Sequence, residues 1–441
     1  MRILIVSYYF PPYMNVGGFR AMSWARRFFD RGHDVTVICG DGQEAESCSF
    51  FYESLDRDIR TLKIHNPLLE AAPASGSRAP EEGIVDKLKT MLKPYLPMVD
   101  SYVLWSRAAV SAALEETRKG GRFDAVISTS FPLSAHAVAR TVKKATGSVW
   151  AADFRDFYGQ FASNELADSP RSRFLARRFR AYGREADLVL TVSKKLKKLV
   201  DKALGIGLPE QVADKTRSVH DDQTEGAMVL YNGYFAEHLP PIPPAPSAPP
   251  RWRILYTGSY NNNEFTVEPL AKALSAWPAE AGEKPEICFT GNLIESVEKA
   301  FREVGATLRF LGPIDNREAL RLQAGSAFLL ICDSMSGPGA LLTKTFEYLA
   351  VRRPIIGISR PGSELRGNLF AAKAAGYCLS MDPGEILSFM LRWREAFGGG
   401  GIQDAFYANE IISQYSREFQ ADLLVDRLEA LSKSRRQGAA E

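Results

Sequence analysis

The chain has 441 residues, which is too long for one ordinary hydrophobic core and suits two domains of roughly 200 residues each. Hydrophobic residues make up 45% of the chain and charged residues 24%, as is typical of a soluble globular protein. The formal net charge of +3 is too small to favour a nucleic-acid partner, so no nucleic acid is expected.

The cysteines and the apolar runs bear on the compartment. The five cysteines have no paired spacing that suits zinc, so we expect buried, reduced thiols in a cytoplasmic protein. The first apolar run ends in Pro11-Pro12 without a small-residue cleavage site, which indicates a strand and not a signal peptide. No apolar stretch approaches the roughly 18 residues that cross a bilayer, so any contact with the inner face of the cytoplasmic membrane is expected to be peripheral.

The chain opens in the order that a phosphate-binding loop requires. We predict a strand at 2–8, a Pro-rich turn, the run Asn15-Val16-Gly17-Gly18 and a helix at 19–31. Glycine lets the backbone approach a ligand without a Cβ in the way, and the free N–H groups of a helix start carry partial positive charge. Gly17 and Gly18 are therefore candidate ligand-binding residues, although a glycine pair alone is more often a tight turn.

Further strands and helices alternate through the first half. Strands are expected at 34–39, 60–65, 123–129, 149–154 and 187–192, with helices at 103–118 and 132–146, which predicts a doubly wound parallel sheet. The irregular stretches 40–58 and 67–100 are long enough to be active-site or acceptor-side loops. Asp56-Arg57-Asp58 matches a metal-binding DxD pattern, but it does not end a clear buried strand, so no metal site is predicted.

Charged residues follow the strand at 149–154. Asp153, Arg155 and Asp156 leave its carboxyl end, where open α/β sheets bind ligands. They either line a cleft between the domains, with Arg155 near donor phosphates or an anionic acceptor, or form an ion network that caps the strand; both interpretations stay open. His136 lies inside a predicted helix and is either a packed core residue or a catalytic one.

Basic residues are dense between 171 and 198 and are interrupted by one strand. They are Arg171, Arg173, Arg177, Arg178, Arg180, Arg184, Lys194, Lys195, Lys197 and Lys198. Such a face could lie on anionic lipid, or the residues could simply be solvated along ordinary surface helices.

A Pro-rich linker at 239–250 separates the halves, and a second alternation follows. Strands are expected at 253–257, 287–290, 308–311, 327–332, 355–358 and 377–380. Helices are expected at 265–276, 295–304, 317–324, 341–353 and 364–375, with two closing helices of which the last spans 408–432. Two Rossmann-like halves are therefore predicted.

The helix and strand at 341–358 carry the strongest local signal. Leu342, Phe346, Leu349 and Ala350 form one apolar face, and Pro354 ends the helix before a buried strand. Lys344 and Glu347 share the opposite face, just after the stretch 336–340, whose backbone N–H groups could meet an anion. The alternative is a solvated ion pair between the two side chains.

The opening strand with Gly17-Gly18, Asp153-Phe154-Arg155-Asp156, Tyr256-Thr257-Gly258-Ser259 and the segment 344–357 resemble the retaining GT-B glycosyltransferases of the family 4 type, a resemblance that covers nearly the full length. It implies an α/β protein of GT-B fold, with two Rossmann-like doubly wound parallel-sheet domains facing across a cleft. We accordingly expect an acceptor-side domain at 1–238, the linker at 239–250, a nucleotide-sugar-binding domain at 251–407, and a returning helix with a polar tail at 408–441.

The resemblance also implies roles for residues. Glu347 would bind both ribose hydroxyls, and the loop at Gly17-Gly18 would reach the donor diphosphate and the acceptor. Two positions depart from the family: Gly339 stands where many members have another Glu, and residues 260–264 lack the usual Arg and Lys. Stabilisation of the leaving phosphate would then fall to Lys344, Arg155 and the backbone N–H groups of Gly258, Ser259, Ala340 and Leu341. The predicted catalytic residues are Lys344, Arg155 and His136, and the predicted donor-binding residues are Gly17, Gly18, Gly258, Ser259, Gly339, Ala340, Leu341, Lys344 and Glu347.

The leading hypothesis is a hexosyltransferase-type glycosyltransferase that works without metal or cofactor. It would move a sugar, with retention, from a UDP- or GDP-sugar to a glycan or lipid-linked acceptor in bacterial surface polysaccharide synthesis. The alternatives are a non-catalytic nucleotide-sugar-binding scaffold and a nucleotide-sugar epimerase of the same fold. A dinucleotide oxidoreductase is disfavoured because the first loop lacks G-x-G-x-x-G.

Overall fold

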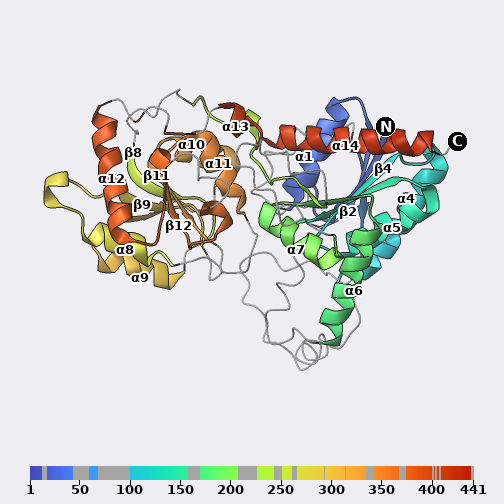
Figure 1. Cartoon of the computed structure of the whole chain (residues 1–441), viewed down its shortest axis with the longest axis horizontal. Helices are drawn as coiled ribbons and strands as arrows, with labels where there is room; N and C mark the ends of the chain where they lie inside the picture. The colour runs from blue at the N-terminus through green and yellow to red at the C-terminus, as the bar shows by residue number, and fades with distance from the viewer. Residues whose placement is uncertain are drawn as a thin grey trace. The chain divides into compact units, whose positions relative to one another are not determined.

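The computed structural model describes residues 1–11, 17–42, 59–67, 100–156, 169–206, 226–242, 251–260, 266–292, 294–312, 314–333, 341–366, 374–399, 402, 405–406 and 409–438. Internal contacts divide the chain into unit 1, Met1–Tyr231 with Gln420–Glu441, and unit 2, Asn232–Phe419. Each unit contains one parallel sheet with helices packed against it (Figure 1). In the part of the chain described, no helix is both long and apolar enough to span a membrane.

Unit 1 is built on a seven-stranded sheet in the order β3-β2-β1-β4-β5-β6-β7, with every pair parallel. Its strands are β1 (Arg2–Val6), β2 (Asp34–Gly40), β3 (Arg60–Ile64), β4 (Ala125–Thr129), β5 (Val149–Phe154), β6 (Leu188–Thr191) and β7 (Met228–Val229). Its helices are α1 (Gly18–Asp30), α4 (Val103–Gly120), α5 (Ser134–Thr146), α6 (Pro170–Glu185), α7 (Lys194–Leu204) and most of α14 (Arg417–Gln437). The order reverses at β1 and β4, as in a doubly wound sheet.

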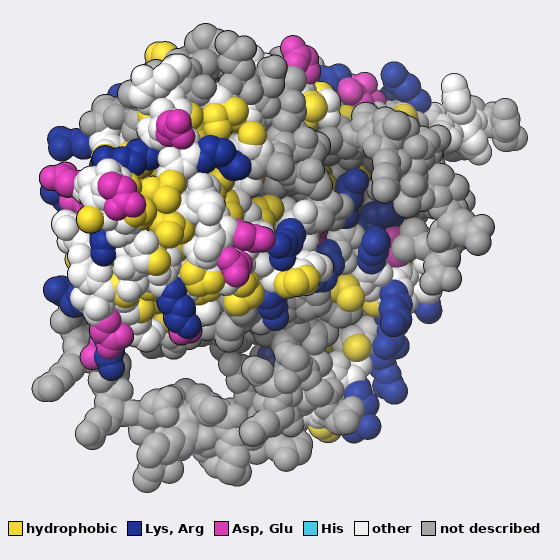
Figure 2. All heavy atoms as spheres, turned by 60° about the vertical axis from the view of Figure 1, so that its left-hand side comes forward, with side chains coloured by type: hydrophobic (Ala, Val, Ile, Leu, Met, Phe, Trp, Pro, Cys, Tyr) yellow, Lys and Arg dark blue, Asp and Glu magenta, His cyan; other side chains and the backbone are white. Residues whose placement is uncertain are grey.

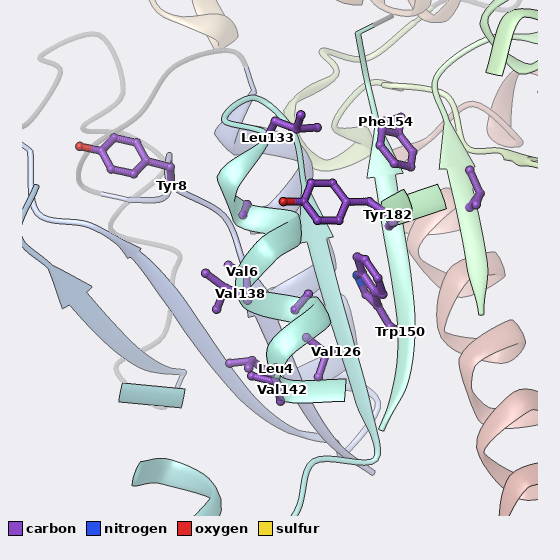
Figure 3. Close-up of a cluster of buried hydrophobic side chains, with 14 of the residues drawn as sticks. Leu4, Val6, Tyr8, Val126, Leu133, Val138, Val142, Trp150, Phe154 and Tyr182 are labelled. Carbon is purple, nitrogen blue, oxygen red and sulfur yellow. The ribbon is translucent and has the colours of Figure 1, made fainter. Parts of the chain in front are cut away.

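The central strands of unit 1 are apolar because both faces are covered. On one face, Val6 of β1, Val126 of β4 and Trp150 of β5 meet Val138 of α5 and Tyr182 of α6 in a continuous buried cluster (Figure 3). On the other side α1 and α14 are joined by ion pairs, with the Arg27 guanidinium 2.7 Å from the Asp422 carboxylate. Fully buried parallel strands need continuous apolar runs, which is why their positions were predictable.

Unit 2 repeats the plan with six parallel strands in the order β10-β9-β8-β11-β12-β13. Its strands are β8 (Arg251–Tyr256), β9 (Glu286–Phe289), β10 (Leu308–Phe310), β11 (Ser326–Cys332), β12 (Ile355–Ile358) and β13 (Tyr377–Leu379). Its helices are α8 (Glu268–Ser275), α9 (Glu295–Glu303), α10 (Asn316–Ala324), α11 (Thr343–Val351), α12 (Pro383–Gly398) and α13 (Asn409–Ser413). Two such sheets confirm the predicted α/β class and the GT-B plan of two Rossmann-like units.

Two predicted elements differ from the structure. The last of the two expected closing helices, at 408–432, is divided into α13 and α14, because the backbone turns between them and pairs with Tyr234: the Arg417 N–H donates to the Tyr234 carbonyl at 2.9 Å. The helix expected at 364–375 falls mostly on residues outside the described ranges, and a short 3-10 helix, Ala374–Gly376, ends that stretch.

The same pairing affects where the units divide. Residues 232–238 and 408–419 belong to unit 2, whereas the predicted boundaries placed the first of these stretches in the N-terminal domain and the second with the returning helix. Tyr234 lies in an isolated parallel bridge with Ser416, which holds both stretches together within unit 2.

Candidate active site

In unit 2, the start of α11 lies beside the loop that follows β8. The Lys344 ammonium lies 3.6 Å from the centroid of the Tyr256 ring. It would be 3.7 Å from a Cβ added to Gly258. Lys344 and Gly258, which are 86 positions apart in the chain, are therefore close in space, as two parts of a donor site must be.

The loop at Gly258 is exposed on one side and packed closely against Gly291 on the other. Gly258 and Ser259 are exposed, and Gly258 has φ +92°, which other residues rarely adopt. Behind them, a Cβ on Gly291 would lie only 2.6 Å from the Gly258 carbonyl carbon. The Gly258 N–H, which we predicted would meet the leaving phosphate, instead donates to Thr290 Oγ1 at 3.0 Å. Gly258 thus allows close approach of a ligand while its own donor is already used.

Glu347 is half-buried and held by two amides of α10. Its Oε1 accepts from Asn316 Nδ2 at 2.8 Å and its Oε2 accepts from Gln323 Nε2 at 3.3 Å. The Lys344 ammonium lies over the Tyr256 ring, and among the ion pairs between described residues there is none that joins Lys344 to Glu347, the alternative weighed from the sequence. Leu341, just before the helix, is buried.

In unit 1 the structure brings Gly17 and Arg155 together. The Arg155 guanidinium lies so close to Gly17 that any Cβ there would overlap its nitrogens, and Arg155 Nε donates to the Ser130 carbonyl. Burial lowers the pKa of Arg155 from its very high ordinary value, while nearby carboxylates oppose that shift. Gly18, the first residue of α1, is buried. A guanidinium at a helix start is an arrangement that favours an anion.

Asp153 has a structural role that involves a residue missed from the sequence. It is fully buried and forms a bidentate pair with Arg20, with both nitrogen–oxygen distances 3.0 Å. Arg20 also donates to the carbonyls of Leu230 and Tyr231 at 2.7 and 3.1 Å. The pair therefore ties α1 to the end of β5 and to the chain after β7. Asp153 bonds to Arg20, and the charges of Asp153 and Asp156 both act on Arg155, opposing the lowering of its pKa.

The structure favours a core role for His136 over the predicted catalytic one. Its ring is fully buried, with its centroid 4.6 Å from that of Phe154 and 5.9 Å from that of Tyr182. Trp150 Nε1 donates to Ser128 Oγ at 2.8 Å, and Ser128 Oγ lies 2.8 Å from His136 Nδ1, so the hydroxyl is placed to donate to the imidazole. Burial lowers the pKa of His136 to about 3, so the ring is neutral.

Some predicted site residues lie outside the described residues. They are Gly339 and Ala340 of the donor site, and the Asp56-Arg57-Asp58 run that we had set aside. Within the described ranges, no group of three or more His, Cys, Asp or Glu is placed to hold a metal ion.

Sequence reasoning missed Arg20, Asn316 and Gln323. Arg20 lies inside an amphipathic helix and looks like an ordinary surface arginine. Asn316 and Gln323 are seven residues apart, which places them on one face of α10, but only the fold shows that this face meets Glu347.

Comparison with known proteins identifies a family match in the first half of the chain and structures of similar fold. Residues 17–212 match the glycosyl transferase 4-like domain family. Among solved structures, a sucrose-phosphate synthase from Thermosynechococcus elongatus superposes with a TM-score of 0.60 at 14% identity, covering 100% of both chains. HepE from Anabaena, in complex with UDP-glucose, gives 0.59 at 13% identity, covering 98% of this chain and 100% of that one. WaaG, a glycosyltransferase involved in lipopolysaccharide biosynthesis, gives 0.53 at 13% identity, covering 96% and 99%. No curated protein sequence matches significantly.

The fold and these comparisons define a two-unit α/β protein of GT-B fold, and the stretch that matches the glycosyl transferase 4-like domain lies in unit 1.

Proposed function

We propose that this protein is a hexosyltransferase that takes a sugar from a nucleotide-sugar donor and transfers it, with retention, to a glycan or lipid-linked acceptor in bacterial surface polysaccharide synthesis. The donor is a UDP- or GDP-sugar. Support for UDP comes from the fold relatives HepE, in complex with UDP-glucose, and a trehalose-6-phosphate protein from E. coli bound with UDP-2-fluoro glucose. WaaG, involved in lipopolysaccharide biosynthesis, supports the class of acceptor.

The donor proposal rests on two side chains of α11, Glu347 and Lys344. Each oxygen of Glu347 accepts one amide N–H, which leaves further lone pairs for the two ribose hydroxyls. Lys344 offers an ammonium next to the exposed loop at Gly258 and Ser259, where a diphosphate could be held. Charge growing on the leaving phosphate is then stabilised by Lys344, and by Arg155 with the start of α1. In this proposal no metal takes part.

Replacing Glu347 tests the donor site. Glu347→Ala should weaken nucleotide-sugar binding by about 1–3 kcal/mol, because a charged hydrogen-bond partner is lost. The measurement is the melting temperature of wild type and variant with UDP-, GDP-, ADP- and CMP-sugars, since a ligand that binds only the folded state raises it. Glu303→Ala, on an exposed face of α9, is the matched control. An equal shift in wild type and Glu347→Ala would remove Glu347 from the site.

The products decide between the remaining alternatives. Sugar transferred to an added acceptor supports the glycosyltransferase, whereas an isomerised donor without acceptor supports an epimerase. A donor that binds and is never consumed supports a scaffold.

We also propose that α6 contacts anionic lipid at the inner face of the cytoplasmic membrane. Arg173, Arg177, Arg180 and Arg184 are spaced along one helical face and are all exposed. Between residues 171 and 184 there is no acidic residue. This stripe would hold the enzyme beside a lipid-linked acceptor.

A further inference from the structure

The hydrogen bonds around Glu347 fix which atom of each amide faces it. An ionised carboxylate only accepts hydrogen bonds, so Asn316 and Gln323 must both turn their NH2 groups toward Glu347. The two amides come from one face of α10, and α10 packs against α11, which carries Glu347. Both of these hydrogen bonds to the Glu347 carboxylate therefore come from a single helix, α10.

The contact with Glu347 leaves one buried polar atom of Gln323 without a hydrogen bond to any described residue. It is fully buried, and its Nε2 also donates to Thr257 Oγ1 at 3.1 Å, while its Oε1 has no hydrogen-bond partner among the residues described. Buried polar atoms are rarely left unpaired, so an unpaired one needs a reason. Turning the amide over would bring its oxygen against a Glu347 oxygen, and the repulsion explains why Oε1 stays unpaired.

Asn316 extends the chain of hydrogen bonds in the other direction. With its NH2 group on Glu347, its Oδ1 can only accept, and it lies 3.2 Å from Nδ1 of the buried His238. The proton of His238 must then be on Nδ1. His238 ends the short 3-10 helix Ala236–His238, which lies near the start of unit 2. Hydrogen bonds through Asn316 therefore link Glu347 to this segment.

We propose that Asn316 and Gln323 are positioning residues that orient Glu347 so that its remaining lone pairs accept the vicinal ribose hydroxyls, and that this is how the site distinguishes a ribonucleotide from a deoxyribonucleotide. The inference rests on the proposed role of Glu347 in donor binding. A freely rotating carboxylate could accept one hydroxyl equally well, whereas two hydroxyls at once require a fixed plane.

The test is calorimetric titration of wild type, Asn316→Ala, Glu347→Ala and the double variant with UDP and GDP, and with their 2′-deoxy counterparts. Wild type should prefer the ribonucleotide. Asn316→Ala should weaken ribonucleotide binding about tenfold, as expected for one lost orienting hydrogen bond, and leave the deoxynucleotide affinity within about twofold. Adding Asn316→Ala to Glu347→Ala should cause no further loss, because the positioned group is already gone.

Gln323→Met, which keeps the buried volume and removes the amide, should reproduce the loss of ribose preference, and Glu318→Ala on the same helix is the control that should not. Equal losses for ribo- and deoxynucleotide, or additive losses in the double variant, would overturn the positioning role. Intact ribose preference in Asn316→Ala, with that preference lost in Glu347→Ala, would overturn it while leaving Glu347 in the donor site. A wild type without ribose preference would remove both proposals.

Discussion

Two buried features of unit 1 affect its stability: the Arg20–Asp153 ion pair and the neutral ring of His136. Arg20 and Asp153 are 3% and 0% exposed, and each would be left as an uncompensated charge if the other were removed. His136 is buried as a neutral ring next to Phe154, with Ser128 as its hydrogen-bond partner. Protonation of that ring therefore competes with folding.

The stability of the protein should fall with acid because of His136. The pKa is lowered to about 3 in the folded protein, so the unfolded state binds a proton first as the pH falls below the ordinary value of 6.5. At pH 5 this removes about 2 kcal/mol of the unfolding free energy present at pH 7. His136→Asn keeps an acceptor for Ser128 and cannot titrate, so urea unfolding of this variant should show a smaller loss between pH 7 and pH 5. Equal losses in both proteins would show that His136 is not the group responsible; His33, whose pKa burial also lowers, is common to both.

At the scale of elements, the start of α1 and the end of β5 form one corner of unit 1. Arg155 follows β5 directly and lies against Gly17, which precedes α1. The absence of a side chain at position 17 is what lets the guanidinium occupy this place.

Adding a methyl group at Gly17 should displace Arg155. Gly17 has φ −70°, so alanine fits the backbone there and the effect is confined to contacts. We expect Gly17→Ala to lower kcat for sugar transfer at least tenfold, with little change in melting temperature, because charge stabilisation at the leaving phosphate is lost. Gly398→Ala is the control, since a Cβ there meets nothing within 4 Å. Unchanged kcat in Gly17→Ala would exclude Arg155 from the reaction.

Much of this element structure was predictable. Apolar runs gave the parallel strands, and the spacing around 342–350 placed α11 with Lys344 and Glu347 on its other face. What could not be predicted depends on contacts between distant segments: the partner of Arg20, the two amides that hold Glu347, the Thr290 acceptor for the Gly258 N–H, and the turn between α13 and α14. His136 was ambiguous for the same reason, because only the packing of α5 on β5 shows that its helical face is buried.

On the scale of the whole molecule, charge is nearly balanced yet unevenly distributed. The net charge is only +3, whereas α6 presents four exposed arginines along one helical face. On the face drawn in Figure 2, Lys and Arg side chains gather in a column toward the right, and both signs are interspersed at the left.

Membrane binding should depend on that stripe and on salt. Replacing Arg173, Arg177 and Arg180 together by alanine should weaken binding to phosphatidylglycerol vesicles by about 3 kcal/mol, near 1 kcal/mol for each residue. Replacing the exposed Arg302, Arg309 and Arg321 of unit 2 changes the net charge equally and should have little effect. Sedimentation with phosphatidylglycerol and phosphatidylcholine vesicles measures both. If the two triple variants lose affinity equally, net charge and not α6 is responsible.

The division of the chain into units has a consequence for its synthesis. Unit 2 is one continuous segment inserted into unit 1, and the residues from Gln420 onward complete the earlier domain. Arg20 bonds to the carbonyls of Leu230 and Tyr231, which are translated 210 and 211 positions later. Arg27 pairs with Asp422, 395 positions later. Because domains fold as they emerge from the ribosome, unit 2 can complete its packing first, and the first residues to be translated are among the last to reach their final contacts.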